Sequence, residues 1–150
     1  MTITRSATEI LNGTIDSVKN VIPFELTIDK PTLVTAPYQQ KSLGVLIGLT
    51  GDFRGRVVID GNQEVFSKIG EAMFGMALEG EMLDSFSGEL GNMIAGNLTT
   101  FVSKNGIAMD ITPPTVLVGE TKMYGFDKAL SLKVTLADTG TLNIILMLEV

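Results

Sequence analysis

The chain has 150 residues, 45% of them hydrophobic and 19% charged, which is enough apolar material to form a buried core in one domain. It contains no Cys, His or Trp, and this excludes disulfides, thiolate or imidazole metal sites, cysteine nucleophiles and histidine bases. Its net charge of −6 and the absence of a Lys/Arg cluster argue against nucleic acid as a partner.

The sequence also carries no signal for export or membrane insertion. Its first ten residues lack a basic segment followed by an apolar run. The longest apolar stretches, 43–49 and 142–148, have the length of strands and are far too short to cross a bilayer. We therefore expect a soluble, cytoplasmic protein with no membrane partner.

The first half of the chain predicts a helix followed by strands. Apolar residues recur at helical spacing over 7–21, and Pro23 ends this helix. A β-rich strand over 32–36 lies between two prolines. The segments 43–49 and 56–59 then predict a hairpin around a glycine-containing turn.

The second half begins after a helix that Asn62 can cap. A long helix is expected over about 81–104, where an Asn-Gly pair ends it. A strand over 115–118 follows two prolines, and 129–136 with 142–149 predict a second hairpin. The eight methionines, Met76 among them, are expected mainly as core filler.

Both halves therefore have the same order of elements, a helix, a proline-led strand and a hairpin, with the helix after Asn62 between them. We predict an α+β fold of two αβββ units, whose strands merge into one antiparallel sheet covered by helices, as a single domain over 1–150. The segment 142–148 is apolar on both faces. This predicts either a central strand or an edge strand completed by a partner chain.

The long helix carries the candidate functional residues. In helical projection its large apolar residues face one side, whereas Ser85, Glu89, Asn92 and Gly96 form a row on the opposite side. The acid of this row can pair with a cation, and the amide can both donate to and accept from a water molecule. Such a pair can position a nucleophilic water.

Three glycines, Gly88, Gly91 and Gly96, flank this row. Each costs about 1 kcal/mol relative to alanine inside a helix, so together they favour a bare surface against which another backbone can lie. Glycines also serve helix packing, and a Glu and an Asn at this spacing are common on solvated helix faces. The residues alone therefore leave both interpretations open.

The stretch from Ser85 to Asn97, SFSGELGNMIAGN, resembles the signature helix of the CheC/CheX/FliY family of response-regulator phosphatases. That signature has Asp or Ser, three residues, Glu, two residues, Asn, and a proline a little over twenty residues later. Here Pro113 and Pro114 follow Asn92 by 21 and 22 positions, within a segment, DITPPTV, that also resembles CheX. The resemblance covers most of the chain and implies the CheC-like fold.

The resemblance further implies a phosphatase that acts on a phosphorylated receiver of the CheY type. In that family the Glu, here Glu89, pairs with the receiver lysine beside the aspartyl phosphate. The Asn, here Asn92, orients the attacking water, and we expect Ser85, Gly88 and Gly96 to contact the receiver. The Mg²⁺ ion belongs to the receiver, so the chain is expected to need no metal or cofactor of its own. Such phosphoryl transfer asks mainly for positioning and charge neutralisation.

The first helix repeats the spacing with Glu9 and Asn12, but Arg5 stands where the signature has Ser or Asp. We predict that this pair is a relic or a coincidence, so that the chain carries one motif, as CheX does. CheX proteins form homodimers through edge strands, and the resemblance implies a homodimer here.

Two other functions remain open at this point. One is a non-catalytic adaptor or switch-complex component of the same fold, which binds a receiver without dephosphorylating it. The other is a structural dimer without a receiver partner. The intact signature favours the enzyme, but it does not identify the receiver or its pathway.

Overall fold

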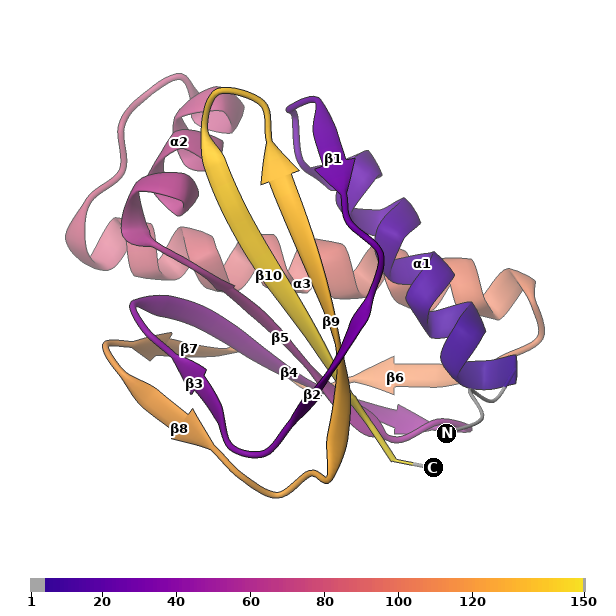
Figure 1. Ribbon diagram of the computed structural model, residues 1–150. Helices are drawn as coiled ribbons and strands as arrows, with labels where there is room; N and C mark the ends of the chain where they lie inside the picture. The colour runs from indigo at the N-terminus through magenta and orange to yellow at the C-terminus, as the bar shows by residue number, and fades with distance from the viewer. Residues whose placement is uncertain (1–4, 150) are drawn as a thin grey trace.

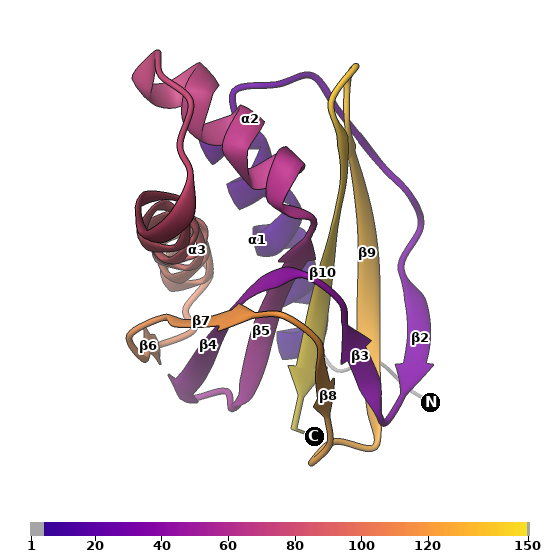
Figure 2. The same ribbon diagram turned by 90° about the vertical axis from the view of Figure 1, so that its left-hand side faces the viewer.

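The computed structural model describes residues 5–149, which form an eight-stranded antiparallel sheet, three helices and a two-stranded ribbon (Figures 1 and 2). The helices are α1 (Arg5–Val21), α2 (Gln63–Phe74) and α3 (Gly80–Lys104). The strands are β1 (Leu26–Ile28), β2 (Thr32–Thr35), β3 (Tyr38–Gln40), β4 (Leu43–Gly51), β5 (Gly55–Gly61), β6 (Met109–Ile111), β7 (Thr115–Val118), β8 (Thr121–Met123), β9 (Lys128–Leu136) and β10 (Gly140–Leu148).

The sheet has the order β1-β9-β10-β5-β4-β6, and β2 and β7 extend its two edges by pairing with β9 and β4. The two hairpins, β4–β5 and β9–β10, meet at the centre through the β5–β10 pair. Each half of the chain gives its first strands to the hairpin of the other half. Thus β1 and β2 pair with β9, and β6 and β7 pair with β4. The predicted duplication and the merged antiparallel sheet are confirmed, with strands exchanged between the halves.

Local signals place the helix boundaries. The Asn62 side chain accepts a hydrogen bond of 2.9 Å from the backbone N–H of Val65, as the sequence predicts for the cap of α2. The helix ends at Gly75, whose left-handed φ of 75° lets its N–H bond to the carbonyl of Glu71. The long helix α3 begins one residue before the predicted 81 and ends at 104 as predicted.

The helices cover one face of the sheet, and the β3–β8 ribbon covers part of the other. Successive residues of β5 show the alternation: Val57 and Ile59 join the core under the helices, whereas Val58 packs with ribbon residues on the opposite face. β10 lies between β5 and β9 and is buried from Ile144 to Met147 on both faces. Of the two placements that the sequence left open for this segment, the central one is confirmed and the edge one is wrong.

The methionines do not all fill the core. Met109, Met123 and Met147 are buried, but Met76 and Met82 are exposed, so the interpretation as core filler is wrong for these two. Met76 lies in the connection between α2 and α3, and Met82 lies in the first turns of α3. Among the helices of residues 5–149, none is both long and apolar enough to span a membrane.

Candidate functional site

Two glycines let α3 lie close to the sheet. A Cβ atom added to Gly91 would stand 2.7 Å from Cγ1 of Val45 on β4, and one added to Gly88 would stand 3.1 Å from Cγ2 of Val116 on β7. Both glycines are buried. The prediction that they lie on a bare outer surface is therefore wrong, and Gly88 contacts the protein's own sheet instead of being open to a partner. Because glycine has no side chain, the hydrophobic pattern of the sequence does not show that Gly88 and Gly91 are buried.

The polar row is formed as predicted. Ser85 and Glu89 are exposed on α3, Asn92 is half-buried, and an added Cβ at Gly96 would meet nothing within 4 Å. Within residues 5–149, no hydrogen bond or ion pair engages the side chains of Ser85, Glu89 or Asn92. Asn92 is thus half-buried and keeps its amide groups unpaired among these residues.

Other polar residues of α3 behave differently from this row. Four of them donate side-chain hydrogen bonds to the helix carbonyl four residues earlier: Ser87, Asn97, Thr99 and Thr100. Their bonding capacity is already used within the helix. Within the part of the chain that the structure describes, the side chains of Ser85, Glu89 and Asn92 make no such bond, so their polar groups are available to a partner.

The two prolines noted in the sequence lie beside this helix. The β6–β7 connection is fixed to β4 by Thr112, whose N–H donates to the carbonyl of Gly48 at 2.9 Å, while its Oγ1 accepts from the Gly48 N–H at 2.8 Å. From there Pro114 reaches α3, and its Cγ lies 3.9 Å from the position of a Cβ on Gly88. Pro114, which follows Asn92 by 22 positions, thus contacts the buried side of the site helix.

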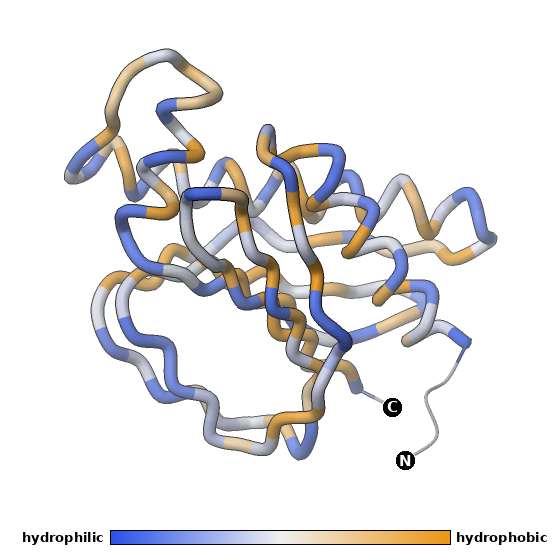
Figure 3. The backbone as a smooth tube through the Cα atoms, turned by 45° about the horizontal axis from the view of Figure 1, so that its top comes forward, coloured by the Kyte–Doolittle hydropathy of each residue, from blue (hydrophilic) through white to orange (hydrophobic). Residues whose placement is uncertain are grey.

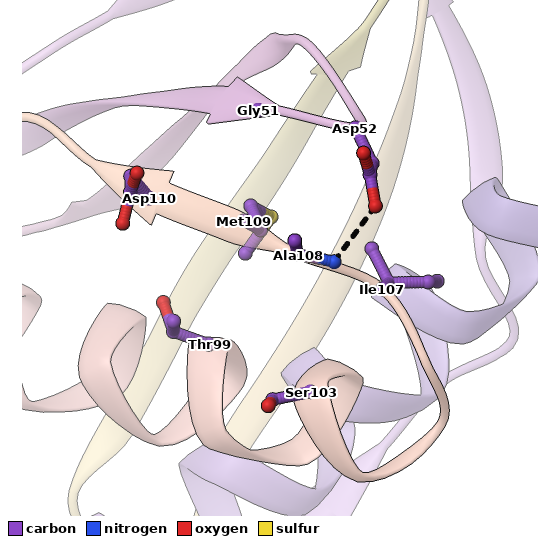
Figure 4. Close-up of a pocket in the computed structure, with 8 residues that line it drawn as sticks. All are labelled: Gly51, Asp52, Thr99, Ser103, Ile107, Ala108, Met109 and Asp110. Atoms are coloured by element: carbon purple, nitrogen blue, oxygen red, sulfur yellow. Dashed lines mark hydrogen bonds between the residues drawn. The ribbon is translucent and has the colours of Figure 1, made fainter.

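A hollow of about 250 Å³ lies further along α3 (Figure 4). Its lining comes from the C-terminal half of α3, from β6 and from the start of the β4–β5 turn: Gly51, Asp52, Thr99, Ser103, Ile107, Ala108, Met109 and Asp110. The Asp52 carboxylate accepts a hydrogen bond of 2.9 Å from the backbone N–H of Ala108. The lining holds two carboxylates and no cationic side chain, so it does not suit a phosphate group.

The charges of the site helix are nearly all negative. Its acidic residues are Glu81, Asp84 and Glu89, and its single basic residue, Lys104, is the last of the helix. Among residues 5–149, no three acidic side chains lie together in a way that could hold a metal ion. The site can therefore pair with a cationic group through Glu89 and position a water molecule through Asn92.

The second Glu-Asn pair lies on α1, which packs against α3. Gly13 lies under the side chains of Leu98 and Phe101, and a Cβ there would stand 2.7 Å from Leu98. Glu9 accepts a hydrogen bond of 2.8 Å from Nδ2 of Asn105, just beyond the end of α3. The carboxylate of this pair is thus engaged within the protein, in contrast to Glu89.

A buried polar group that the sequence did not reveal lies on the opposite face of the sheet. The Tyr38 hydroxyl on β3 donates to the Asp60 carboxylate on β5. Burial raises the pKa of Asp60, although the bond from Tyr38 and the charge of Lys41 act in the other direction. The neighbouring Gln40 is fully buried, and its amide has no hydrogen-bond partner among residues 5–149. This group fastens the ribbon to the sheet, away from α3.

The fold and the polar row define a protein of the CheC-like class, and comparison with solved structures agrees. A CheC-like superfamily protein from Shewanella sp. PV-4 superposes with a TM-score of 0.81 at 24% identity, over 95% of this chain and 98% of that one. A CheX–CheY–BeF₃–Mg²⁺ complex from Borrelia burgdorferi matches with a TM-score of 0.80 at 24% identity, over 99% of this chain and 100% of that one. Both likenesses confirm the predicted α+β fold.

The family follows from the sequence comparisons. The family model described as chemotaxis phosphatase CheX matches residues 43–129. The CheY-P phosphatase CheX of Thermotoga maritima is 32% identical over 136 residues, which cover 87% of each chain. The chain belongs to the CheX family of chemotaxis phosphatases.

Proposed function

We propose that this protein dephosphorylates a receiver domain of the CheY type, with Glu89 and Asn92 as the residues that enter the receiver's active site. The observation that carries the proposal is the row on α3, in which the unpaired carboxylate of Glu89 and the unpaired amide of Asn92 stand one turn apart. Family membership supports the reaction class. The carboxylate and the amide of the row are suited to positioning a water molecule.

The reaction divides between the two proteins. Water attacks the phosphorus, the bond between phosphorus and the receiver's aspartyl oxygen breaks, and inorganic phosphate leaves the restored carboxylate. Asn92 holds the water in line by accepting one of its protons in a hydrogen bond through the amide oxygen. Glu89 pairs with the receiver's lysine and fixes the orientation of the complex. A Mg²⁺ ion held by the receiver would neutralise charge on the phosphoryl oxygens, and this chain would need no cofactor of its own.

The test is the decay rate of phosphorylated receivers from the same cell, with and without this protein. We expect the wild type to accelerate decay of at least one receiver. Asn92→Ala should lose the acceleration and keep its affinity for the receiver, because the amide acts mainly in the transition state. Asn97→Ala is the matched control, since Asn97 lies on the same helix and its side chain donates to the backbone carbonyl of Met93. Equal rates for wild type and Asn92→Ala would refute the assignment, and binding without acceleration by the wild type would indicate an adaptor.

We also propose a cytoplasmic homodimer joined through edge strands. β10 lies inside the sheet, so the available edges are those of β1 with β2 and of β6 with β7. β7 borders the site helix at Gly88, whereas β2 lies at the opposite edge and exposes Leu33. A seam along β2 would leave Glu89 and Asn92 open in both protomers. Light scattering at micromolar concentration should give the mass of two chains, and a monomeric mass would contradict the proposal.

A further inference from the structure

Three large hydrophobic side chains are exposed together at the corner where α2 passes into α3. Phe74 is 60% exposed, Met76 55% and Met82 59%. We call these three residues the corner patch. Figure 3 shows the connection between the two helices at the outer corner of the molecule, with hydrophobic colours along it. Neither the phosphatase chemistry nor the packing of the core requires these side chains to be exposed.

The corner patch is continuous with the polar row. Met82, Ser85 and Glu89 follow one another at spacings of three and four residues, so they lie on the same face of α3. Phe74 is held against the next face of the helix, because its ring meets the ring of Phe86 edge-on, with centroids 5.7 Å apart. A protein that covers Glu89 and extends toward the start of α3 therefore also covers Met82.

The corner has a fixed backbone. Leu78 is buried, and its side chain packs over Gly70 of α2. The carbonyl of Leu78 accepts a hydrogen bond of 3.1 Å from the hydroxyl of Ser67. Gly75 and Gly80 take left-handed φ angles of 75° and 57° on either side of this contact. The exposure of Met76 thus follows from a connection that is anchored on both sides.

The corner patch can supply the binding free energy that the polar row lacks. A charge pair at an interface, such as the one proposed for Glu89, gains little net affinity because desolvation offsets its attraction, and an amide that orders water in the transition state adds little to ground-state affinity. A protein interface obtains most of its affinity from a few apolar anchors that lose their contact with water. Methionine is suited to this task because its flexible thioether adapts to the opposing surface. The polar row therefore needs an apolar neighbour, and the corner patch is continuous with it.

We propose that the corner patch is the apolar anchor of the receiver interface, so that the receiver lies over the N-terminal half of α3 and the α2–α3 corner. The inference rests on the proposed function, since it names the surface by which the same partner is held. The hollow at the other end of α3 is not part of this surface. Its lining carries the carboxylates of Asp52 and Asp110, and two of its polar groups, those of Asp52 and Thr99, already bond within the protein.

The experiment compares wild type with the double variant Met76→Gln/Met82→Gln. Glutamine keeps the length of the side chain and the helix propensity of position 82, but it removes the apolar end. We expect KM for the phosphorylated receiver to rise at least about tenfold, with kcat nearly unchanged. Affinity for the beryllofluoride-bound receiver should fall by the same factor. Tyr124→Ser is the control, because Tyr124 is 63% exposed and directly follows β8, which lies at the end of the molecule opposite α2 (Figure 2).

The outcomes separate this inference from the proposed function. If the wild type binds the receiver but does not accelerate its decay, the phosphatase proposal fails, and a loss of affinity in the double variant still supports the anchor. If the wild type is active and the double variant has the same KM and affinity, the anchor is refuted. If the double variant has the mass of a monomer in light scattering and an unchanged KM, the patch is a contact between two copies of the chain. This outcome also refutes the proposed anchor.

Discussion

Gly91 of α3 lies so close to Val45 of β4 that a Cβ atom at position 91 would stand 2.7 Å from the Cγ1 atom of the valine. On the same helix, Gly96 has nothing within 4 Å of an added Cβ. The two glycines therefore have different roles. Gly91 sets the distance between helix and sheet, whereas Gly96 leaves the outer surface of the helix bare beside Asn92.

The first prediction compares alanine at these two positions. Gly91→Ala should lower the free energy of unfolding by about 1–3 kcal/mol, because the methyl group overpacks a buried contact. Gly96→Ala should raise it by about 0.5–1 kcal/mol, because alanine restricts the unfolded chain and favours the helix. Urea unfolding followed by circular dichroism measures both. A Gly91→Ala variant as stable as Gly96→Ala would show that α3 can move away from β4 without loss.

The same Gly96→Ala protein tests whether this surface meets the receiver. If the receiver backbone lies against Gly96, the added methyl group should weaken receiver binding even though the fold becomes more stable. Titration of the beryllofluoride-bound receiver gives the affinity. Unchanged affinity would remove Gly96 from the interface and leave the N-terminal half of α3 as the contact.

The second prediction separates Glu89 from Asn92. Glu89→Gln should reduce both receiver affinity and turnover, because truncating one side of a desolvated charge pair costs about 2–5 kcal/mol. Glu25→Gln is the charge-matched control, since Glu25 is an exposed acid that precedes β1 and lies outside α3. If both variants lose affinity equally, the effect comes from net charge and not from a specific pair.

The third prediction concerns the pair on α1. Asn12→Ala should leave turnover unchanged, because Glu9 is already bonded to Asn105 and α1 lacks the free carboxylate that accompanies Asn92. The variant is assayed beside Asn92→Ala under the same conditions. A loss of activity in Asn12→Ala with normal stability would mean that both helices carry working sites.

The fourth prediction is a pH dependence of stability. Burial raises the pKa of Asp60 in the folded protein above its unfolded value, so protonated Asp60 favours the fold. This contribution is present below the unfolded pKa and is lost as the pH rises through the folded pKa. Asp60→Asn keeps the acceptor for Tyr38 and removes the titration. Its stability relative to wild type should therefore be higher at pH 7 than at pH 3.5.

Denaturant titrations of both proteins at several pH values measure this difference. Other titrating groups cancel in the comparison, because both proteins share them. A difference that stays constant over this pH range would mean that Asp60 ionises as easily in the folded protein as in the unfolded chain.

The sequence predicted the long elements and the polar row because both depend on local periodicity. The spacing of Ser85, Glu89 and Asn92 determines their common face on any regular helix. The apolar residues of β10 on both faces likewise indicated burial on two sides, which the structure confirms. The same projection places Met82 in the row of Glu89, but hydrophobicity alone assigns a methionine to the core.

Other features depend on contacts that a linear pattern does not contain. The strands β1, β3, β6 and β8 have three residues each, too few to show an alternating pattern. Helical spacing places Gly91 away from the polar row, but it does not reveal the contacts of Gly88 and Gly91 with β7 and β4. The exchange of strands between the halves joins residues distant in sequence, such as Leu26 with Leu136, and only the folded chain reveals it.

Because of this exchange, each half of the chain completes the sheet of the other half. A chain cut between α2 and α3 would leave the β4–β5 hairpin without β6, β7 and β10, which all come from the other fragment. Each fragment alone would expose apolar strand faces and open edges, and the two together could rebuild the sheet. The half that carries α1 thus supplies strands without which the half with Asn92 cannot complete its sheet, whether or not α1 carries a working motif.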